Sequence, residues 1–342
     1  MGYQYFNTDE MIKNTTVFDE RDPSLKKESF HIAYGIDKNF LFGCGVSIAS
    51  VLMNNREMDF VFHVFIDQLS TDDVQTFSQL AKSYKTCIQL HIVNCEKLKS
   101  FPTTKNWSVA MYFRFIIGDY FIGSQKVILY LDADIVCKGD ISGLVNILPD
   151  DKVAGVVPER DQSWWEQRAH SLHCPALEKG YFNSGMLLLN IDAWAREYVS
   201  GRAMEMLSDK KITSMLSYMD QDILNLILHD KVQFIDKIYN TQFSLNYELK
   251  KTFINPVSDS TVFIHYVGPT KPWHSWSCYA SATPFLVARE HSPWKDTPLM
   301  SPGNANYARY CANIILNKAK ISQGSLIIFF TFTLRLKGEH CR

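Results

Sequence analysis

Two aspartates stand two residues apart in the most informative segment of the sequence, residues 127–134 (VILYLDAD). The apolar run before them is typical of a strand that is buried on both faces of a parallel sheet. Ionised carboxylates inside such a strand would be costly, so we expect Asp132 and Asp134 at its carboxyl end, where open α/β sheets bind ligands. Two hard oxygen donors suit Mg²⁺ or Mn²⁺. The alternative is a strand end that carries two solvated aspartates.

A second segment has side chains that could take part in binding or catalysis. This segment, residues 265–274 (HYVGPTKPWH), also follows an apolar run. His265 can serve as a third metal ligand, because imidazole is a common one. Gly268 lets the backbone approach a phosphate closely, and Lys271 supplies a positive charge for it. Alone, the segment equally suits a rigid Pro-flanked loop whose histidine forms a hydrogen bond in the core. Beside an Asp-x-Asp strand, the ligand-binding interpretation is favoured.

The composition narrows the class of protein. The 342 residues carry a formal net charge of −1, so no overall field attracts nucleic acid, and we expect no nucleic-acid partner. The eight cysteines are scattered without a CxxC pair, which favours reduced thiols in the cytosol. Residues 1–27 lack the apolar run of a signal peptide, and no stretch reaches the roughly 18 to 20 apolar residues that span a bilayer. We therefore expect a cytoplasmic protein.

Apolar runs and helical patterns alternate along the chain, which predicts an α/β protein with a doubly wound, mainly parallel central sheet. Proline, serine, tryptophan and tyrosine become frequent from residue 276, which indicates a small C-terminal appendage. The predicted parts are an N-terminal extension (1–29), a main domain (30–275) and the appendage (276–342). Strands are predicted at 31–37, 60–66, 88–93, 127–131, 181–191, 232–235 and 261–266, and helices at 41–52, 71–84, 108–120 and 219–228.

At this point the sequence resembles a known family, the retaining family 8 glycosyltransferases, which are nucleotide-sugar-dependent enzymes of the Rossmann-like GT-A fold. The resemblance covers residues 30–275, and within the family the chain looks most like bacterial lipopolysaccharide core α-1,3-glucosyltransferases and galactosyltransferases. It depends on five ordered motifs, at 33–39 (AYGIDKN), 132–134 (DAD), 181–185 (YFNSG), 220–222 (DQD) and 265–273 (HYVGPTKPW).

The resemblance implies a set of roles. Asp132, Asp134 and His265 would hold Mg²⁺ or Mn²⁺, and the donor would be UDP-glucose or UDP-galactose. Asp220, Gln221 and Lys271 would be the catalytic residues. The donor and its metal would be bound by Gly35, Asp37, Asn39, Arg114, Asp132, Ala133, Asp134, Asn183, Ser184, Gly268 and Lys271.

General chemistry agrees with these roles, because breaking a sugar–diphosphate bond loads negative charge onto the leaving group. Retention of configuration by double displacement would need a carboxylate nucleophile. Gln221 occupies the debated position, and an amide is a poor nucleophile. We therefore favour front-face attack, with Asp220 positioning a sugar hydroxyl.

The expected acceptor is lipid-linked lipopolysaccharide core at the cytosolic face of the inner membrane, reached by peripheral contact. The apolar strip at residues 325–334 is flanked by cations, which suits an anionic membrane surface and suits a last core element equally well. Two other functions remain open. One is a glycogenin-like enzyme that glucosylates itself or another protein, and the other is a metal- and nucleotide-binding module without catalysis.

Overall fold

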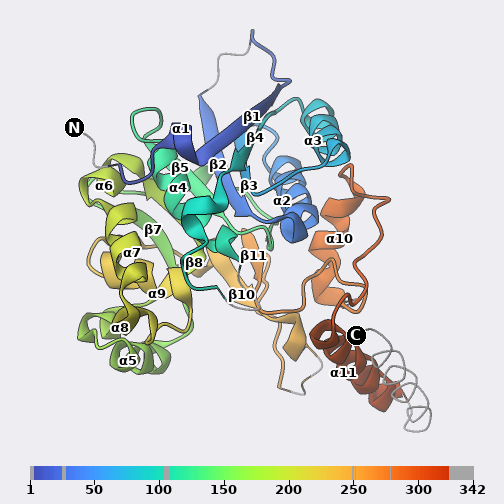
Figure 1. The fold of residues 1–342 in the computed structure, drawn as a ribbon. Coiled ribbons are helices and arrows are strands. Elements are labelled where there is room, and N and C mark those ends of the chain that lie inside the picture. Colours follow the sequence, from blue (N-terminus) through green and yellow to red (C-terminus); the bar gives the residue numbers. More distant parts are fainter. Residues whose placement is uncertain are drawn as a thin grey trace.

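An eight-stranded sheet forms the centre of the molecule (Figure 1). The structure is a computed structural model that describes residues 4–24, 28–103, 108–248, 250, 252–277 and 279–322, with the backbone alone at 317–322. The strands lie in the order β1-β4-β3-β2-β5-β8-β7-β9. Their bounds are β1 Ile12–Asp19, β2 Ser29–Ile36, β3 Asp59–Ile66, β4 Cys87–Val93, β5 Val127–Leu131, β7 Ala154–Pro158, β8 Phe182–Asn190 and β9 Val232–Phe234.

The middle of this sheet is parallel. Strands β4, β3, β2 and β5 pair in parallel, and β9 is parallel to β7. Strand β8 runs antiparallel to both of its neighbours, β5 and β7, and β1 is antiparallel to β4 at the edge. The predicted α/β class with a mainly parallel central sheet is confirmed.

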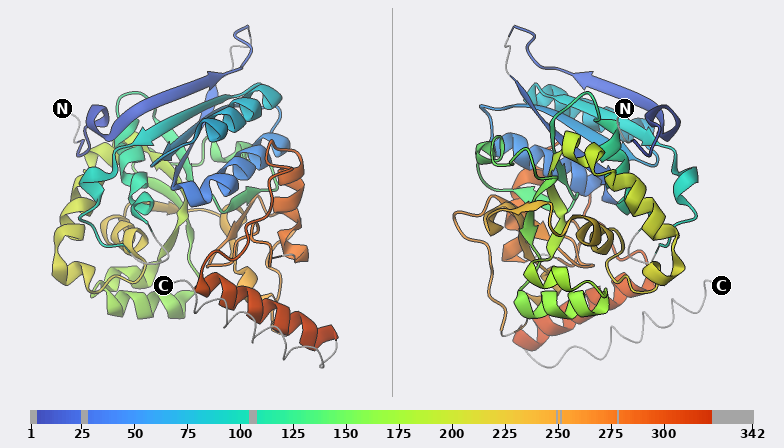
Figure 2. Two further views of the ribbon diagram at one scale, coloured as in Figure 1. Left: turned by 45° about the vertical axis from the view of Figure 1, so that its right-hand side comes forward. Right: turned by 90° about the vertical axis from the view of Figure 1, so that its left-hand side faces the viewer.

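Helices cover both faces of the sheet and make a three-layered molecule (Figure 2). One face packs against α2 (Leu41–Asn54), α3 (Thr71–Tyr84) and α10 (Thr283–Glu290). The other packs against α4 (Phe113–Tyr120), α6 (Ile191–Arg196), α7 (Val199–Ser208) and α9 (Met219–Leu228). The shorter or more peripheral helices are α1 (Thr8–Met11), α5 (Gln162–Ser171), α8 (Lys210–Thr213) and α11 (Ala305–Ser322).

The apolar strands serve two hydrophobic cores, one on each face of the sheet. In β2, Ile32 and Tyr34 belong to the core beneath α2, whereas Ala33 between them belongs to the core beneath α4. Successive side chains of a strand point to opposite faces, so a strand buried on both faces needs a continuous apolar run. This is why the central strands were recognisable as uninterrupted apolar segments.

A smaller three-stranded sheet adjoins the main one, with β11 (Phe263–Tyr266) between β10 (Thr241–Phe243) and β6 (Ile135–Cys137). Strand β11 is parallel to β10 and antiparallel to β6. Residues 132–134 alone separate β5 of the large sheet from β6 of the small one. The chain therefore changes sheets at the two aspartates, and both lie at a strand end, as predicted.

The C-terminal part lies beside the main domain, with α11 below α10 in Figure 1. Tyr307 of α11 packs on the segment that follows β11, since its ring centroid lies 5.0 Å from that of His274 and 5.6 Å from that of Trp276. Within the described ranges, no helix combines the length and the apolar character needed to cross a bilayer. The apolar strip at 325–334 falls outside the described residues.

Several features differ from the sequence-based prediction. Strands β6, β7 and β10 and helices α1, α5 to α8, α10 and α11 were not predicted. The predicted N-terminal extension contains an edge strand, β1, that pairs with β4 along its length, although no strand was predicted before residue 31. The predicted helix at 108–120 begins as a 3₁₀ turn at Val109–Tyr112 and becomes α-helical only in α4.

Candidate functional site

Asp132, Asp134 and His265 come together where the two sheets meet. The pairing of β11 with β6 places His265 opposite Ile135, directly after the aspartates. Nε2 of His265 lies 3.2 Å from Oδ1 of Asp134 and 4.0 Å from Oδ2 of Asp132. One ligand atom from each residue lies within 4.8 Å of the other two. The structure thus gathers the three predicted metal ligands, which are distant in the sequence.

The arrangement of these residues fits a divalent cation. Oδ1 of Asp134 is buried and has no hydrogen-bond partner, which is unusual for a polar atom inside a protein. Gly185 of β8 leaves the space beside the cluster open, because a Cβ atom there would lie 2.9 Å from Oδ2 of Asp132 and 2.9 Å from Nδ1 of His265. Two carboxylates and an imidazole are ligands that suit Mn²⁺ or Mg²⁺.

Lys271 lies on the other side of Asp134. Its Nζ contacts Oδ2 of Asp134 and donates a hydrogen bond to the backbone oxygen of Tyr266 at 3.0 Å. The loop can return to the site because Gly268 has a φ of +89°, a conformation that favours glycine. Burial tends to raise the pKa of Asp134, but the charges of Lys271 and His265 outweigh it and hold that pKa well below its ordinary value.

Arg114 connects Asp132 to Asp220 of the DQD motif. This buried guanidinium, at the start of α4, donates from Nη2 to Oδ1 of Asp132 at 3.1 Å and from Nη1 to the backbone oxygen of Ser184 at 2.6 Å. Its Nε lies 3.0 Å from Oδ2 of Asp220. Tyr130 adds a hydrogen bond from its hydroxyl to Oδ1 of Asp132 at 2.7 Å. Arg114 therefore fixes the positions of two predicted site carboxylates.

Asp220 is a site carboxylate whose pKa is shifted in the opposite direction to that of Asp134. Burial raises the pKa of Asp220 to about 6, although the neighbouring charge of Arg114 lowers it. Desolvation penalises the charged form of a carboxyl group, and here one guanidinium shared with Asp132 does not compensate fully. Perturbed carboxyl groups of this kind are frequent in functional sites.

Four predicted site residues form one hydrogen-bonded group between β8 and α9, namely Asn183, Ser184, Asp220 and Gln221. Oε1 of Gln221 accepts hydrogen bonds from the backbone N–H of Ser184 at 3.0 Å and from Nδ2 of Asn183 at 3.3 Å. The hydroxyl of Ser184 lies 3.4 Å from the same oxygen and 3.5 Å from Oδ2 of Asp220. The motifs at 181–185 (YFNSG) and 220–222 (DQD), about 40 residues apart in sequence, are thus joined by hydrogen bonds.

Three of the residues predicted to bind the donor lie at the end of β2 or just after it, namely Gly35, Asp37 and Asn39. Gly35 approaches the helical segment of α4 closely, since a Cβ there would lie 2.9 Å from Cβ of Phe113. Asp37 accepts hydrogen bonds from the backbone N–H of Asn39 at 2.8 Å and from the hydroxyl of Ser108 at 2.7 Å. Ala133, the other predicted contact, is buried between the two aspartates.

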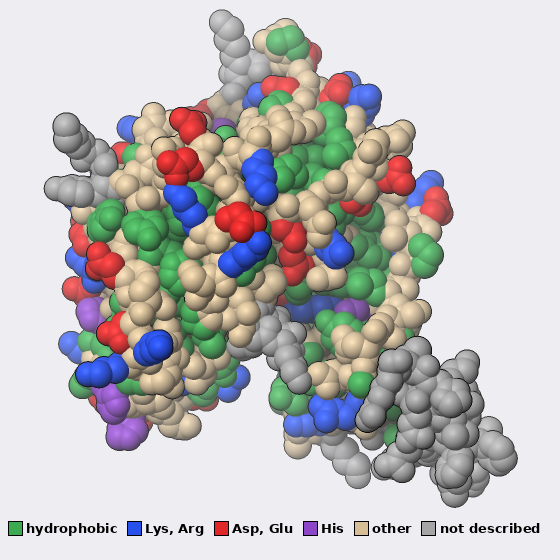
Figure 3. All heavy atoms as spheres, in the orientation of Figure 1, with side chains coloured by type: hydrophobic (Ala, Val, Ile, Leu, Met, Phe, Trp, Pro, Cys, Tyr) green, Lys and Arg blue, Asp and Glu red, His purple; other side chains and the backbone are tan. Residues whose placement is uncertain are grey.

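The segment that follows β2, with Asp37, Asn39 and Phe40, adjoins the loop that carries Lys271. Phe40, just after Asn39, packs its ring against Trp273 with centroids 5.7 Å apart, and Nζ of Lys271 lies 6.0 Å from the centre of the Phe40 ring. Figure 3 shows acidic, basic and histidine side chains gathered in a hollow near the centre of this face. The predicted donor-binding residues at 35–39 and at 268–271 therefore lie in neighbouring loops.

Several residues of the site were not recognised from the sequence. They are Tyr130, Glu159, Gly185 and Asn240. Gly185 stands inside a recognised motif, so its place was signalled without its role. Glu159 and Asn240 belong to no motif, and only the fold brings them to the site, where Glu159 accepts a hydrogen bond from Asn183 and Asn240 bonds to His265.

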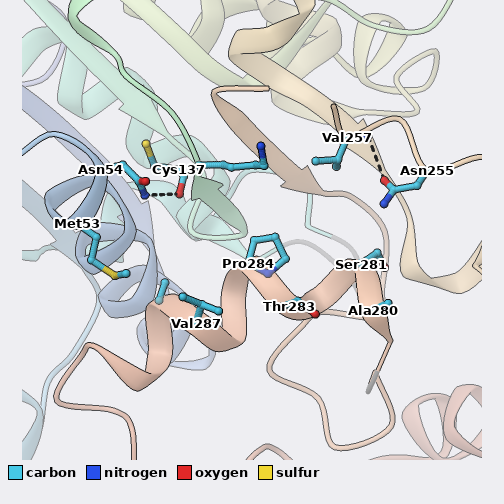
Figure 4. A pocket seen from close by; sticks show the side chains of 12 residues that line it. Met53, Asn54, Cys137, Asn255, Val257, Ala280, Ser281, Thr283, Pro284 and Val287 are labelled. Atoms are coloured by element: carbon cyan, nitrogen blue, oxygen red, sulfur yellow. Dashed lines mark hydrogen bonds between the residues drawn. The ribbon is translucent and has the colours of Figure 1, made fainter. Parts of the chain in front are cut away.

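A separate cavity of about 560 Å³ lies between α2 and α10 (Figure 4). Met53, Pro284 and Val287 supply apolar walls, and Asn54 and Ser281 supply polar ones. None of the predicted site residues lines it. We therefore assign the candidate site to the carboxylate cluster, because the charged and hydrogen-bonded groups gather there.

The fold is that of the GT-A glycosyltransferases. The galactosyltransferase LgtC, solved in complex with donor and acceptor sugar analogs, superposes with a TM-score of 0.66 at 23% sequence identity, covering 77% of this chain and 96% of that one. The pattern of the family described as Glycosyl transferase family 8 matches residues 31–277, and that of its C-terminal region matches residues 279–334. The chain belongs to glycosyl transferase family 8.

Two curated relatives are similar over nearly the whole chain. The lipopolysaccharide glucosyltransferase WaaO of Escherichia coli (strain K12) is 48% identical over 98% of this chain and 100% of its own length. The lipopolysaccharide 1,3-galactosyltransferase of Salmonella typhimurium (strain LT2) is 48% identical over 95% of this chain and 96% of its own. The family and the fold expected from the sequence are confirmed, whereas the roles of individual residues remain predictions.

Proposed function

We propose that this chain is a metal-dependent, retaining hexosyltransferase that moves glucose or galactose from a UDP-sugar to the lipopolysaccharide core in an α-1,3 linkage. The observation that carries the proposal is the cluster of Asp132, Asp134 and His265 with Lys271 beside it. The activities named for the two relatives support lipopolysaccharide as the acceptor class. They also support glucose and galactose as the two candidate hexoses, one for each relative.

Asp132, Asp134 and His265 would hold Mg²⁺ or Mn²⁺, which supplies positive charge to the leaving diphosphate when bound. Lys271 would bind the same phosphate group, and its ammonium is held in place by Asp134 and by the Tyr266 carbonyl. Arg114 keeps Asp132 and Asp220 at a fixed separation, so the protein does not need to rearrange as charge develops. Asp37 and Asn39 would bind the nucleoside.

The hydrogen bonds around Gln221 support front-face attack rather than double displacement. Its Oε1 already accepts hydrogen bonds from Ser184 and Asn183, which leaves an inherently weak amide nucleophile less able to attack a sugar carbon. We propose that the acceptor hydroxyl attacks from the side of the departing diphosphate, which takes its proton. Asp220, fixed by Arg114, positions a hydroxyl of the donor sugar.

We propose that the enzyme works at the cytosolic face of the inner membrane, where lipid-linked core acceptors are exposed. In this proposal residues 30–275 form the catalytic domain, residues 1–29 extend its sheet, and the appendage at 276–342 lies near the acceptor or the membrane. The match of a separate family C-terminal pattern to residues 279–334 supports a distinct C-terminal part.

The test is a donor screen with lipopolysaccharide cores truncated before the outer hexoses. The enzyme is incubated with Mn²⁺ and either UDP-glucose or UDP-galactose, and the product is analysed by mass spectrometry and NMR linkage analysis. We expect one hexose added in an α-1,3 linkage, with no product in excess EDTA. Full activity in EDTA would contradict the metal site. A mass gain on the protein itself would indicate self-glucosylation, and UDP-sugar binding without turnover on any acceptor would indicate a non-catalytic module.

A further inference from the structure

Four polar side chains form a continuous hydrogen-bonded row that ends on the histidine of the candidate metal site. Glu159 follows β7, Asn183 lies in β8, Asn240 ends the 3₁₀ turn Lys237–Asn240 before β10, and His265 lies in β11. The successive distances are 2.7 Å from Asn183 to Glu159, 2.9 Å from Asn240 to Asn183 and 3.0 Å between Asn240 and His265. The row therefore crosses from the large sheet to the small one.

At the Glu159 end of the row, the direction of the hydrogen bond is fixed. A carboxylate only accepts hydrogen bonds, so Oε2 of Glu159 must receive an N–H from Asn183. Glu159 also has Arg160 beside it, with Nε 3.4 Å from Oε1. Asn183 consequently turns its Nδ2 toward Glu159 and its Oδ1 toward the interior.

A second donor supports the same orientation independently. The backbone N–H of Gly185 donates to Oδ1 of Asn183 at 2.9 Å, and a backbone N–H cannot accept. Turning the Asn183 amide over would place its oxygen against a carboxylate and its N–H against another N–H. Asn183 and Asn240 are 6% and 1% exposed, so water offers little compensation for such a mismatch.

The orientation of the Asn183 amide determines that of Asn240, and thereby which nitrogen of His265 carries a proton. Nδ2 of Asn240 donates to Oδ1 of Asn183, which leaves Oδ1 of Asn240 facing Nδ1 of His265. An amide oxygen only accepts, so Nδ1 must carry the proton. When the ring is neutral, Nε2 therefore presents its lone pair toward Oδ1 of Asp134, at 3.2 Å, and toward Asp132. This is the tautomer that a metal ion requires.

We propose that Asn240 is a positioning residue that fixes the tautomer and ring orientation of His265, so that Nε2 is ready to bind a divalent cation. The inference depends on the proposed metal site and deepens it. Outer-shell partners of metal-binding histidines orient the ring in this way. Here the direction is set by Glu159 and Gly185, each of which lies three hydrogen bonds away from the histidine.

The first experiment reads the tautomer without any metal. Protein labelled with ¹⁵N in its histidines is treated with EDTA and studied by long-range ¹H–¹⁵N correlation, and the His265 signals are identified by their loss in His265→Gln. The pH is raised until the ring is neutral, and we then expect a protonated Nδ1 and an unprotonated Nε2. A proton on Nε2 with a bare Nδ1 would overturn the proposal.

The second experiment measures Mn²⁺ affinity by electron paramagnetic resonance of the free ion. Asn240→Leu removes the acceptor and should weaken binding by about 10- to 100-fold, the usual effect of losing an outer-shell partner. Asn240→Asp still offers an oxygen to Nδ1 but loses the N–H that faces Oδ1 of Asn183, so it should weaken binding clearly less than Asn240→Leu does. An equal loss in both variants would show that Asn240 contributes only shape and would overturn the proposal.

A double-mutant cycle tests whether the effect passes through the histidine. In a His265→Gln background, Asn240→Leu should cause no further loss of Mn²⁺ affinity, whereas a full additional loss would contradict the proposed route. Asn55→Leu is the matched control, because Asn55 is another buried asparagine with both ends of its amide bonded to backbone groups of residues 51, 139 and 141. It should leave Mn²⁺ binding unchanged. If the wild type fails to bind Mn²⁺, the proposed metal site is wrong, and the tautomer measurement still decides the role of Asn240.

Discussion

Lys271 contacts Oδ2 of Asp134, and the second oxygen of that carboxylate, Oδ1, is buried without a hydrogen-bond partner. One carboxylate thus faces a fixed cation on one side and has free acceptor capacity on the other, toward His265. A buried acceptor left unsatisfied costs about 1–3 kcal/mol. A bound metal ion would remove this cost, which links the proposed cation site to the stability of the folded protein.

Asp134→Asn should abolish transfer and weaken Mn²⁺ binding by more than the roughly 10- to 100-fold effect of an outer-shell change. A neutral amide cannot replace a charged ligand, while its similar shape should preserve the fold. Mn²⁺ titration, transfer assays and circular dichroism check these points. Asp140→Asn is the control, since Asp140 is exposed and bonds to Ser142 outside the site. Normal turnover by Asp134→Asn with Mn²⁺ would refute the metal-site interpretation.

Lys271→Ala should lower kcat more than it raises the KM for the UDP-sugar. In the proposed mechanism the ammonium would stabilise the leaving diphosphate most when the charge of that group is greatest, and removing one such donor typically costs about 100- to 1,000-fold in kcat. Lys138→Ala provides the comparison, because Nζ of Lys138 bonds to the carbonyls of Ser258 and Asp259, outside the site. An unchanged kcat with only a higher KM would leave Lys271 as a ground-state binding residue.

Gly185→Ala should disrupt the metal site through a single methyl group. The added Cβ would lie 2.9 Å from both Oδ2 of Asp132 and Nδ1 of His265, so one of the two ligands must shift. Gly155→Ala is a matched strand substitution in β7, where the new Cβ would lie 3.4 Å from Cβ of Leu188, an ordinary contact. We expect Mn²⁺ binding to be lost in the first variant and retained in the second. Equal affinities would show that the cluster adjusts freely.

The sequence predicted the elements whose signals are local. Helix α3 begins and ends where expected, because Ser70 and Asp73 form reciprocal capping hydrogen bonds before it and Lys85 ends it in a left-handed conformation. Buried central strands such as β3 and β5 were visible as continuous apolar runs, but the short buried strand β7 was missed. Strand β1 was missed, since its exposed alternate residues give it little apolar character and its partner β4 lies some 70 residues away. Pairing of this kind depends on the tertiary fold.

The candidate site likewise contains some residues that local sequence motifs reveal and others that only the tertiary fold places there. Asp132, Asp134 and His265 stand in recognisable motifs, and the structure brings them together. The roles of Arg114 as a link between two carboxylates and of Asn240 as a partner of His265 follow from hydrogen bonds between distant segments. No residue type or spacing encodes those bonds, so only the three-dimensional arrangement reveals them.

Removal of the C-terminal strip should reduce membrane attachment without impairing donor chemistry. Residues 325–334 are apolar, and Lys318, Lys320, Arg335 and Lys337 flank them, each worth about 1 kcal/mol near an anionic surface. A chain ending at residue 320 should sediment less with anionic vesicles and glycosylate membrane-embedded acceptor more slowly. UDP-sugar hydrolysis and transfer to a soluble acceptor should be spared. Aggregation or loss of hydrolysis would place the strip in the core, and unchanged vesicle binding would place the attachment elsewhere.

Asp220 should make the metal-free protein less stable as the pH rises. Burial raises the pKa of Asp220 from 3.8 to about 6 in the folded state, so between these values the folded protein holds a proton that the unfolded chain releases. The stability contributed by the protonated form is complete below pH 4 and is lost as the pH passes 6. At 1.36 kcal/mol per pKa unit, the loss is on the order of 3 kcal/mol.

Asp220→Asn removes this titration while keeping the size of the side chain. Urea unfolding in EDTA at a series of pH values from 4 to 8 should show the variant gaining stability relative to the wild type as the pH rises. The difference between the two proteins should change mainly between pH 4 and 6 and be constant above pH 7. A difference that stays level across the whole range would mean that Asp220 keeps its ordinary pKa, and that Arg114 compensates fully for its burial.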